Sequence, residues 1–280
     1  MFHVKNRYDS YEGLANDPDV DVVYISTPNN LHKENTVMCL RAGKSVLCEK
    51  PFAINAKETE EMIDLARQRG PFLMEAMWTR FLPAIVKLRE ILAEKTIGEV
   101  RMLIADFGFR SELNPKSRIF DPSLGGGALL DVGIYTVSLA SMVFGNPSRI
   151  TGMAHIGETG VDEQSAVILG YEKGELALLA SAARTTTPHV AHLLGTEGRI
   201  TVGPPFWRPQ SLTFSIRGRP DEVKQFPFEG NGYSYEAAEV NRCLREHKPE
   251  SDIMPLDETF SIMKTMDAIR AEWGLKYPGE

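Results

Sequence analysis

The chain has 280 residues, of which 42% are hydrophobic and 25% charged, and it carries a formal net charge of −7. This composition is typical of a globular protein with room for two domains, and the scattered lysines and arginines exclude the basic face of a nucleic-acid-binding protein. The sequence has neither a run of about 18 uncharged apolar residues nor a signal or transit peptide, so we expect a soluble, cytoplasmic protein without a membrane partner.

The first part of the chain alternates short apolar runs with helical patterns, which is typical of βαβ units and a parallel sheet. The predicted strands are 22–25, 45–48 and 72–75, and the predicted helices are 31–41 and 55–70. Asn55 is expected to cap the second helix with Glu58 as its capping-box partner. Gly43 and Gly70 follow the two helices and favour left-handed helix ends.

After about Trp78 the pattern changes to β-rich segments separated by turn residues. The predicted strands are 100–107, 149–155, 166–171, 175–181, 190–194 and 212–216, and the predicted helices are 82–94, 129–143, 235–246 and 256–273. We therefore predict an α/β chain, with an incomplete doubly wound, Rossmann-like parallel sheet over residues 1–77. An α+β domain with a large, mostly antiparallel sheet follows over residues 78–280.

Two further features bear on cofactors. A dinucleotide-binding fold normally begins with a strand, a G-x-G-x-x-G turn and a helix whose N-terminus holds the pyrophosphate. The sequence has no such turn, since Gly125-Gly126-Gly127 lies in the second part, without a βαβ context. We therefore expect a chain truncated before its glycine-rich half, by fragmentation or by an alternative start, or a protein that has abandoned the cofactor. The three cysteines, Cys39, Cys48 and Cys243, lack metal-ligand spacing, and we expect buried, reduced thiols without a metal.

Four segments in a fixed order are more specific than any single motif. They are Ser26-Thr27-Pro28-Asn29-Asn30-Leu31-His32, Cys48-Glu49-Lys50-Pro51, Glu75-Ala76-Met77-Trp78-Thr79-Arg80-Phe81 and Gly126-Gly127-Ala128-Leu129-Leu130-Asp131-Val132-Gly133-Ile134-Tyr135. Together they resemble the glucose-fructose oxidoreductase / inositol dehydrogenase (Gfo/Idh/MocA) family. The resemblance covers essentially the whole chain. Many relatives have histidine where this chain has Tyr135, which narrows the subgroup and shifts the expected acid/base from an imidazole to a phenol.

The resemblance implies an NADP-dependent dehydrogenase, with NAD not excluded. Its substrate would be a small diol or sugar, a trans-dihydrodiol or an aldopyranose of the D-xylose type, and it would form a homodimer through the C-terminal sheet. Two alternatives remain: a catalytically impaired or non-enzymatic paralogue or fragment that acts as a binding or dimerisation partner, and a sugar-binding module without redox chemistry.

Three residues are the expected catalytic group. Hydride transfer from a carbinol carbon needs a proton acceptor for the hydroxyl and a cation near the developing alkoxide. Lys50, after a predicted parallel strand, is the expected cation, and Tyr135 the expected proton carrier, its phenolate stabilised by Lys50. Asp131 shares a helix face with Tyr135 and is expected to orient Lys50 or to bind substrate. The alternatives are a solvated loop lysine, a carboxylate favoured by the helix dipole and a buried core tyrosine.

The resemblance also implies a set of binding residues. The expected cofactor contacts are Thr27, Pro28, Asn29, His32, Glu49, Lys50, Trp78 and Arg80, and the expected substrate contacts are Trp78, Asp131, Tyr135 and Trp207. The alternatives are turn residues at Asn29, a helix start at His32, a core Trp78 and a domain-crossing salt bridge at Arg80. We also predict a cis peptide bond between Lys50 and Pro51.

Overall fold

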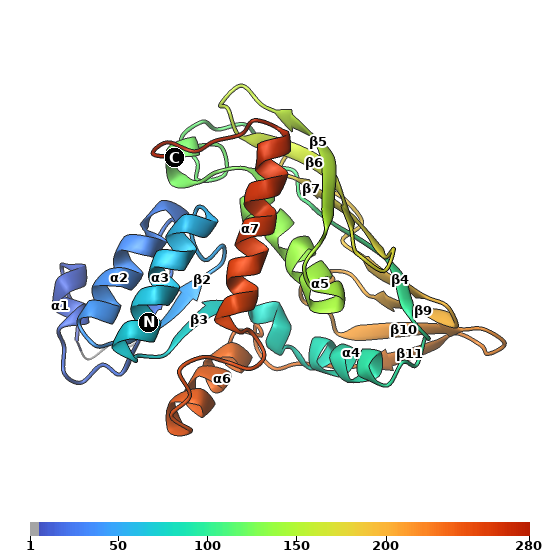
Figure 1. Cartoon of the computed structure of the whole chain (residues 1–280), viewed down its shortest axis with the longest axis horizontal. Helices are drawn as coiled ribbons and strands as arrows, with labels where there is room; N and C mark the ends of the chain where they lie inside the picture. The colour runs from blue at the N-terminus through green and yellow to red at the C-terminus, as the bar shows by residue number, and fades with distance from the viewer. Residues whose placement is uncertain (1–5) are drawn as a thin grey trace.

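The computed structural model describes residues 6–280. Residues 1–5 lie outside the described residues. The expected first domain and the segment searched for a targeting signal both begin with them. Two β-sheets organise the described chain, a small one at the left of Figure 1 and a large one at the right. The expected fold class is therefore confirmed: a parallel Rossmann-like sheet is followed by a large, mostly antiparallel one.

The small sheet has three parallel strands in the order β1-β2-β3. The strands are β1 (Val22–Ile25), β2 (Ser45–Glu49) and β3 (Leu73–Ala76), and the crossover helices are α2 (His32–Arg41) and α3 (Ala56–Arg69). A short helix η1 (Asn29–Leu31) follows β1, and α1 (Tyr11–Ala15) was not predicted. β3 is buried at every position, as expected for a strand covered on both faces.

The predicted helix ends are confirmed with one difference. The side chain of Asn55 accepts a hydrogen bond from the Glu58 backbone N–H at 2.9 Å, and Gly70 has a left-handed φ of 91°. The Glu58 carboxylate accepts from the N–H of Ile54 at 3.3 Å, one residue earlier than a standard capping box requires. The peptide bond between Lys50 and Pro51 is cis, as predicted.

The large sheet has eight strands in the order β11-β10-β9-β8-β4-β7-β6-β5. They are β4 (Val100–Gly108), β5 (Arg149–Ile156), β6 (Asp162–Gly170), β7 (Leu176–Ala182), β8 (Ala191–Gly195), β9 (Gly198–Val202), β10 (Ser211–Ile216) and β11 (Glu222–Gln225). Only the central pair β4 and β7 is parallel. The sequence analysis did not predict β9 or β11. For β11 the reason is that its residues are exposed throughout and have no apolar face, so only its pairing with β10 defines it as a strand.

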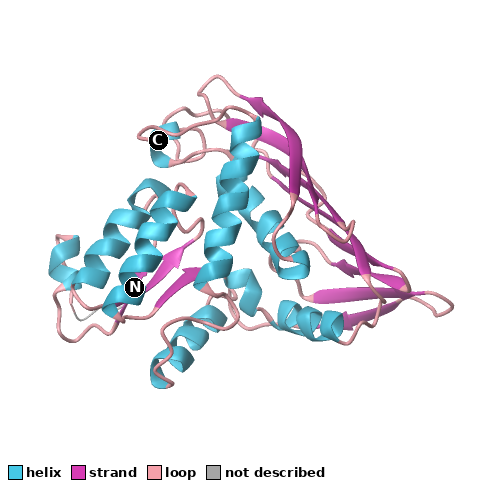
Figure 2. Cartoon of the chain, in the orientation of Figure 1, coloured by secondary structure: helices cyan, strands magenta, loops and turns pink. Residues whose placement is uncertain are grey.

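Helices join the two sheets. They are η2 (Trp78–Phe81), α4 (Pro83–Ala93), η3 (Pro122–Leu124), η4 (Leu129–Gly133), α5 (Ile134–Phe144), α6 (Ser234–Arg245) and α7 (Leu256–Glu272). α7 packs on α3 and β3 on one side and on α5 and β5 on the other. Figure 2 shows α5 and α7 between the two sheets. One hydrophobic core therefore contains residues from both sides of the expected change of architecture near residue 78.

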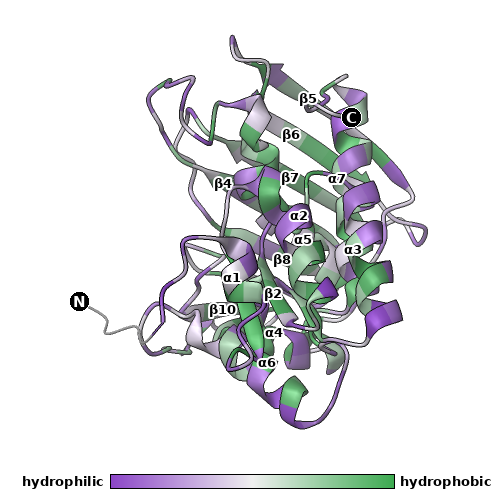
Figure 3. Ribbon diagram, turned by 90° about the vertical axis from the view of Figure 1, so that its left-hand side faces the viewer, coloured by the Kyte–Doolittle hydropathy of each residue, from purple (hydrophilic) through white to green (hydrophobic). Residues whose placement is uncertain are grey.

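The apolar residues lie mainly inside this arrangement. Figure 3 shows hydrophobic colour along β6 and β7 and alternating hydrophilic and hydrophobic segments on α3. The segment Pro122–Phe144 has the length and hydropathy of a membrane-crossing helix, but 78% of its apolar window is buried inside the protein, as in the core helix of a globular fold. The three cysteines are free and buried, as predicted.

Candidate active site

Lys50 is held where the small sheet meets the helix that follows η3. It leaves the carboxyl end of β2, and its Nζ donates a hydrogen bond to the backbone carbonyl of Asp131 at 2.8 Å. The same Nζ lies 3.7 Å from Asp131 Oδ1 and 4.9 Å from the centre of the Tyr135 ring. The structure therefore brings together the three residues that the sequence singled out for chemistry.

The Asp131 carboxylate has a second cation that the sequence did not reveal. Nη1 of Arg118 donates to Asp131 Oδ1 at 2.6 Å, while the Arg118 side chain remains 60% exposed. Asp131 is thus an anion between two cations, which holds its carboxylate in one orientation. Arg118 precedes the glycine run in a loop, where no periodicity relates it to Asp131, so no sequence signal pointed to it.

The helix that carries Asp131 is not a regular α-helix at this point. Residues Leu129–Gly133 form a π-helical turn, and α5 begins only at Ile134. The expected four-residue spacing on one α-helical face is therefore replaced by a wider turn, yet Asp131 and Tyr135 both reach Lys50. Such π-helical turns are frequent at functional sites.

Tyr135 lies in an apolar pocket and is 7% exposed. Burial raises the pKa of its phenol well above the ordinary value, a hydrogen bond from Trp78 opposes this, and the charges of Glu49 and Asp131 add to the rise. Trp78 Nε1 donates to the phenolic oxygen at 2.9 Å. Burial is the largest of these effects and favours the neutral phenol, while Lys50, which the sequence analysis expects to stabilise a phenolate, lies 4.9 Å from the centre of the ring.

Aromatic rings enclose the phenol. Trp207 stacks on Phe107 with ring centres 3.3 Å apart, and these rings lie 6.4 and 5.5 Å from that of Tyr135. On the other side, Trp78 stacks on Tyr233 at 4.7 Å. The structure thus places Trp78 and Trp207, two of the expected substrate contacts, close to Tyr135. Phe107 was missed, although its inward position on β4 is consistent with strand alternation.

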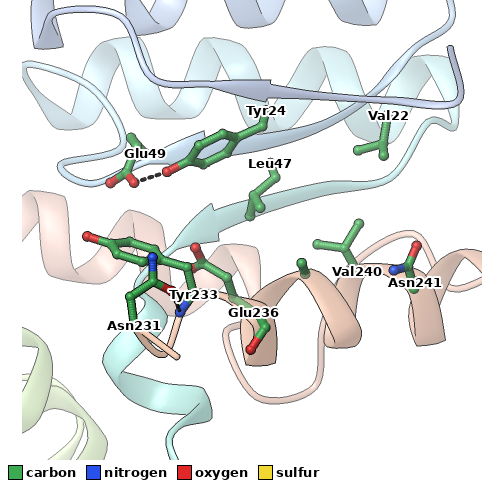
Figure 4. Close-up of a pocket in the computed structure, with 11 residues that line it drawn as sticks. Val22, Tyr24, Leu47, Glu49, Asn231, Tyr233, Glu236, Val240 and Asn241 are labelled. Atoms are coloured by element: carbon green, nitrogen blue, oxygen red, sulfur yellow. Dashed lines mark hydrogen bonds between the residues drawn. The ribbon is translucent and has the colours of Figure 1, made fainter. Parts of the chain in front are cut away.

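A cavity of about 630 Å³ lies between the small sheet and α6 (Figure 4). Tyr24 and Glu49 line it from the sheet, and the Tyr24 hydroxyl donates a hydrogen bond to the Glu49 carboxylate. Tyr233 and Glu236 line it from the opposite side. Glu236 is 2% exposed, and burial, followed by the charge of Glu49, raises its pKa to about 8. Its Oε2 has no hydrogen-bond partner among the described residues.

The residues after β1 make mainly internal contacts. His32 is 1% exposed, and its two ring nitrogens lie 2.8 Å from the carbonyl oxygens of Thr27 and Pro51. Burial lowers the pKa of His32. Asn29 Nδ2 donates to the carbonyl of Gly125 at 3.1 Å. These contacts connect the exit loop of β1, which also contains Pro28, to the turn after Lys50 and to the glycine run. They are the contacts expected of turn and helix-start residues, which is the alternative interpretation given above.

Arg80 is also engaged inside the protein. It is 3% exposed, and it donates to Glu258 at 2.7 Å and to the carbonyl of Ser138 at 2.7 Å. It lines a second cavity with Glu258 and Ser141, not the cavity that Glu49 lines. Arg80 and Glu258 of α7 both belong to the expected second domain, so this salt bridge lies within that domain and does not cross from residues 1–77.

Two family models match the chain. The model described as an oxidoreductase family with an NAD-binding Rossmann fold matches residues 1–77, and the model of the GFO/IDH/MocA C-terminal domain matches residues 85–201.

Among curated proteins, the chain is 39% identical over 283 residues to the trans-1,2-dihydrobenzene-1,2-diol dehydrogenase of Xenopus tropicalis, covering 99% of this chain and 85% of that protein. It is 40% identical over 287 residues to the human protein of that name, covering 98% of this chain and 84% of the relative.

Solved structures share the fold. An aldose-aldose oxidoreductase from Caulobacter crescentus, complexed with glycerol, has a TM-score of 0.85 at 25% identity, covering 95% of this chain and 80% of that one. A 3-ketoreductase from Actinomadura kijaniata, complexed with NADP and TDP-benzene, has a TM-score of 0.81 at 24% identity, covering 95% and 82%. The arrangement of two sheets with Lys50, Asp131 and Tyr135 at their junction is therefore set in a fold that such oxidoreductases share.

Proposed function

Because this chain belongs to the Gfo/Idh/MocA family of oxidoreductases, we propose that it is an NADP-dependent dehydrogenase of trans-dihydrodiols or of aldopyranoses such as D-xylose. The observation that carries the proposal is the meeting of Lys50, Asp131 and Tyr135. The proposed reaction removes a hydride from a hydroxyl-bearing carbon and a proton from its hydroxyl. A trans-dihydrodiol is thereby oxidised to the precursor of a catechol, and an aldopyranose to a lactone.

The residues present fit the nicotinamide end of such a cofactor. Open α/β sheets bind ligands beyond the carboxyl ends of their strands, which is where Lys50 lies. A carboxylate at this edge commonly accepts a hydrogen bond from a ribose hydroxyl. Glu49 lines the cavity beside Lys50, and the carboxyl of Glu236, whose Oε2 has no partner among the described residues, offers a second polar group there. A bound nicotinamide supplies the hydride acceptor. Thr27, Pro28 and Asn29 would border it, and Trp78 would flank it.

Lys50 and Tyr135 have different proposed roles at the substrate hydroxyl. The ammonium of Lys50, held by the carbonyl of Asp131, provides positive charge where the alcohol oxygen becomes negative. The phenol of Tyr135 exchanges a proton with that oxygen. Because burial raises its pKa, Tyr135 is protonated at neutral pH and is the proton donor in the direction of reduction. Oxidation is therefore favoured as the pH rises.

The aromatic surroundings support a ring-shaped substrate. Phe107, Trp207 and Trp78 present flat faces and edges around Tyr135, and such rings pack well against the apolar face of a sugar or a cyclic diol. Asp131, between two cations, is placed to accept a hydrogen bond from a second hydroxyl of the substrate.

We further propose that the protein is a homodimer paired through the outer face of its large sheet. Met153 is 82% exposed there, Ile168 43%, and Ile104 and Leu176 37% each. No helix covers this face in the described part of the chain (Figure 1), and Ile104, Met153 and Ile168 line a mainly aliphatic hollow of about 500 Å³ on it. A contiguous exposed apolar surface of this kind favours association with a protein partner, and a second copy presents the same surface.

The direct test is cofactor binding followed by turnover. NADPH fluorescence is titrated with the purified protein, and NADP reduction is then followed with D-xylose and with trans-1,2-dihydrobenzene-1,2-diol. We expect saturable binding and reduction of NADP with at least one substrate. Absence of binding up to millimolar NADPH and NADH would exclude the enzyme reading of this polypeptide and favour the non-catalytic alternative.

A further inference from the structure

The helix that carries Asp131 and Tyr135 begins without a capping side chain of its own. Ala128 at its N-cap and the three glycines before Ala128 have no side chain that can accept hydrogen bonds from its first N–H groups. Asp162, the first residue of β6, supplies the acceptor: its Oδ2 receives the N–H of Leu129 at 2.7 Å. A carboxylate from the large sheet thus acts as the cap of a helix 33 residues earlier in the chain.

The contact between Asp162 and the helix start requires a glycine at position 127. Its φ is 114°, a conformation that side chains other than glycine rarely adopt, and a Cβ there would lie 2.2 Å from Asp162 Oδ1. On the same turn, the Tyr277 hydroxyl donates to the carbonyl of Gly126 at 2.6 Å. Asp162 and Tyr277 therefore hold the start of the helix from two sides.

The Asp162 carboxyl is fully buried, and its Oδ1 has no hydrogen-bond partner among the described residues. Burial raises its pKa to about 7, and the backbone hydrogen bonds and the charge of Arg270 oppose that rise. The titratable and charged groups that interact with it are Arg270 and Tyr277. A buried carboxyl with one free oxygen is costly, which suggests that its position at this helix start has a use.

We propose that Asp162 is a positioning residue, which sets the start of the catalytic helix and thereby the distances of Asp131 and Tyr135 from Lys50. The contact at Leu129 lies within one turn of Asp131 and two turns of Tyr135. A small shift of the helix start moves both side chains relative to Lys50, whose own position is set by the small sheet. The proposal rests on the proposed function for its kinetic readout only.

The kinetic experiment compares Asp162→Ala and Asp162→Asn with Glu163→Gln, which changes the neighbouring carboxyl on the same strand. We expect Asp162→Ala to lower kcat by about 10- to 100-fold with little change in KM. Asp162→Asn keeps an acceptor oxygen without a charge, so it should retain most of kcat and lose any titration near pH 7. Equal kcat values and equal pH profiles in all three variants would overturn the proposal.

A second measurement needs no activity. The protein has three tryptophans, so the indole N–H of Trp78, which donates to Tyr135, is one of three such NMR signals. We expect Asp162→Ala to shift the Trp78 signal, and Asp162→Asn, which keeps the acceptor oxygen, and Glu163→Gln to leave it close to its parental position. An unchanged Trp78 signal in Asp162→Ala would refute the positioning role. A shifted signal in a protein whose parent is inactive would refute the proposed function and leave the positioning role supported.

Discussion

Lys50 Nζ and the backbone carbonyl of Asp131 are joined by a 2.8 Å hydrogen bond across 81 residues of sequence. The ammonium group comes from the small parallel sheet and the carbonyl from the helix against the large sheet. The bond therefore fixes the two halves of the site against each other, and several consequences of this arrangement can be measured.

Replacing Lys50 by Met removes the positive charge and keeps much of the side-chain volume. We expect NADP reduction to slow by about 100-fold or more, because the developing alkoxide loses its principal electrostatic partner. Lys57→Met, an exposed lysine on α3, is the matched control and should retain parental turnover. Steady-state kinetics decide the matter, and near-parental turnover of Lys50→Met would remove Lys50 from the mechanism.

Tyr135→Phe keeps the ring and removes the hydroxyl that Trp78 contacts. We expect turnover to fall by about 100-fold or more through loss of the proton carrier. Because the pKa of Tyr135 is raised, the parental oxidation rate should climb with pH through the alkaline range, whereas that of the variant should not. Initial rates from pH 6 to 10 test this, and parallel profiles would contradict the assignment.

Trp207→Leu removes one wall of the proposed substrate site. We expect KM for D-xylose or the diol to rise by roughly 5- to 10-fold, since stacking on a ring contributes about 1 kcal/mol. The affinity for NADPH should change little. Trp273→Leu, at the C-cap of α7, provides a control that removes a different tryptophan. A parental KM in Trp207→Leu would show that the wall does not contact substrate.

Glu75 gives a prediction for stability. It is fully buried, and burial raises its pKa from 4.5 to about 7. A carboxyl with a raised pKa in the folded state destabilises the protein as it ionises, so its contribution is present below pH 4.5 and lost as the pH rises through 7. The loss for this group is about 3 kcal/mol at most.

Urea denaturation at pH 5 and pH 8 measures this effect. The parent should lose stability between the two values, and Glu75→Gln should lose less. Glu60→Gln, an exposed position on α3, should behave as the parent does. An identical pH dependence in Glu75→Gln and the parent would show that Glu75 does not titrate in this range.

If the protein pairs through the outer face of its large sheet, a charge placed on that face should disrupt the dimer. Ile168→Lys places an ammonium in the exposed aliphatic face, and we expect the mass in solution to fall to that of a monomer. Val223→Lys adds the same charge on the exposed strand β11 and should leave the dimer intact. Light scattering after size exclusion gives the masses, and a parent that is monomeric at micromolar concentration would refute the interface.

The sequence by itself determined most of the elements and their kind, but not α1, β9, β11 or the π-helical turn at Asp131. Strands β1 to β3, the crossover helices and the caps at Asn55 and Gly70 follow from periodicity and turn chemistry, which act between near neighbours in the chain. The ordered motifs around Lys50 and Tyr135 identified the family, which the comparisons confirm.

Only the tertiary structure decided which groups meet and in which ionisation state. Arg118 at Asp131, Phe107 against Trp207 and Asp162 at Leu129 join residues with no periodic relation. The rise of the Tyr135 pKa likewise depends on how completely the fold removes water from the phenol. Local patterns specify segments, whereas burial and long-range contacts arise only when those segments pack, and the chemistry of this site depends on both.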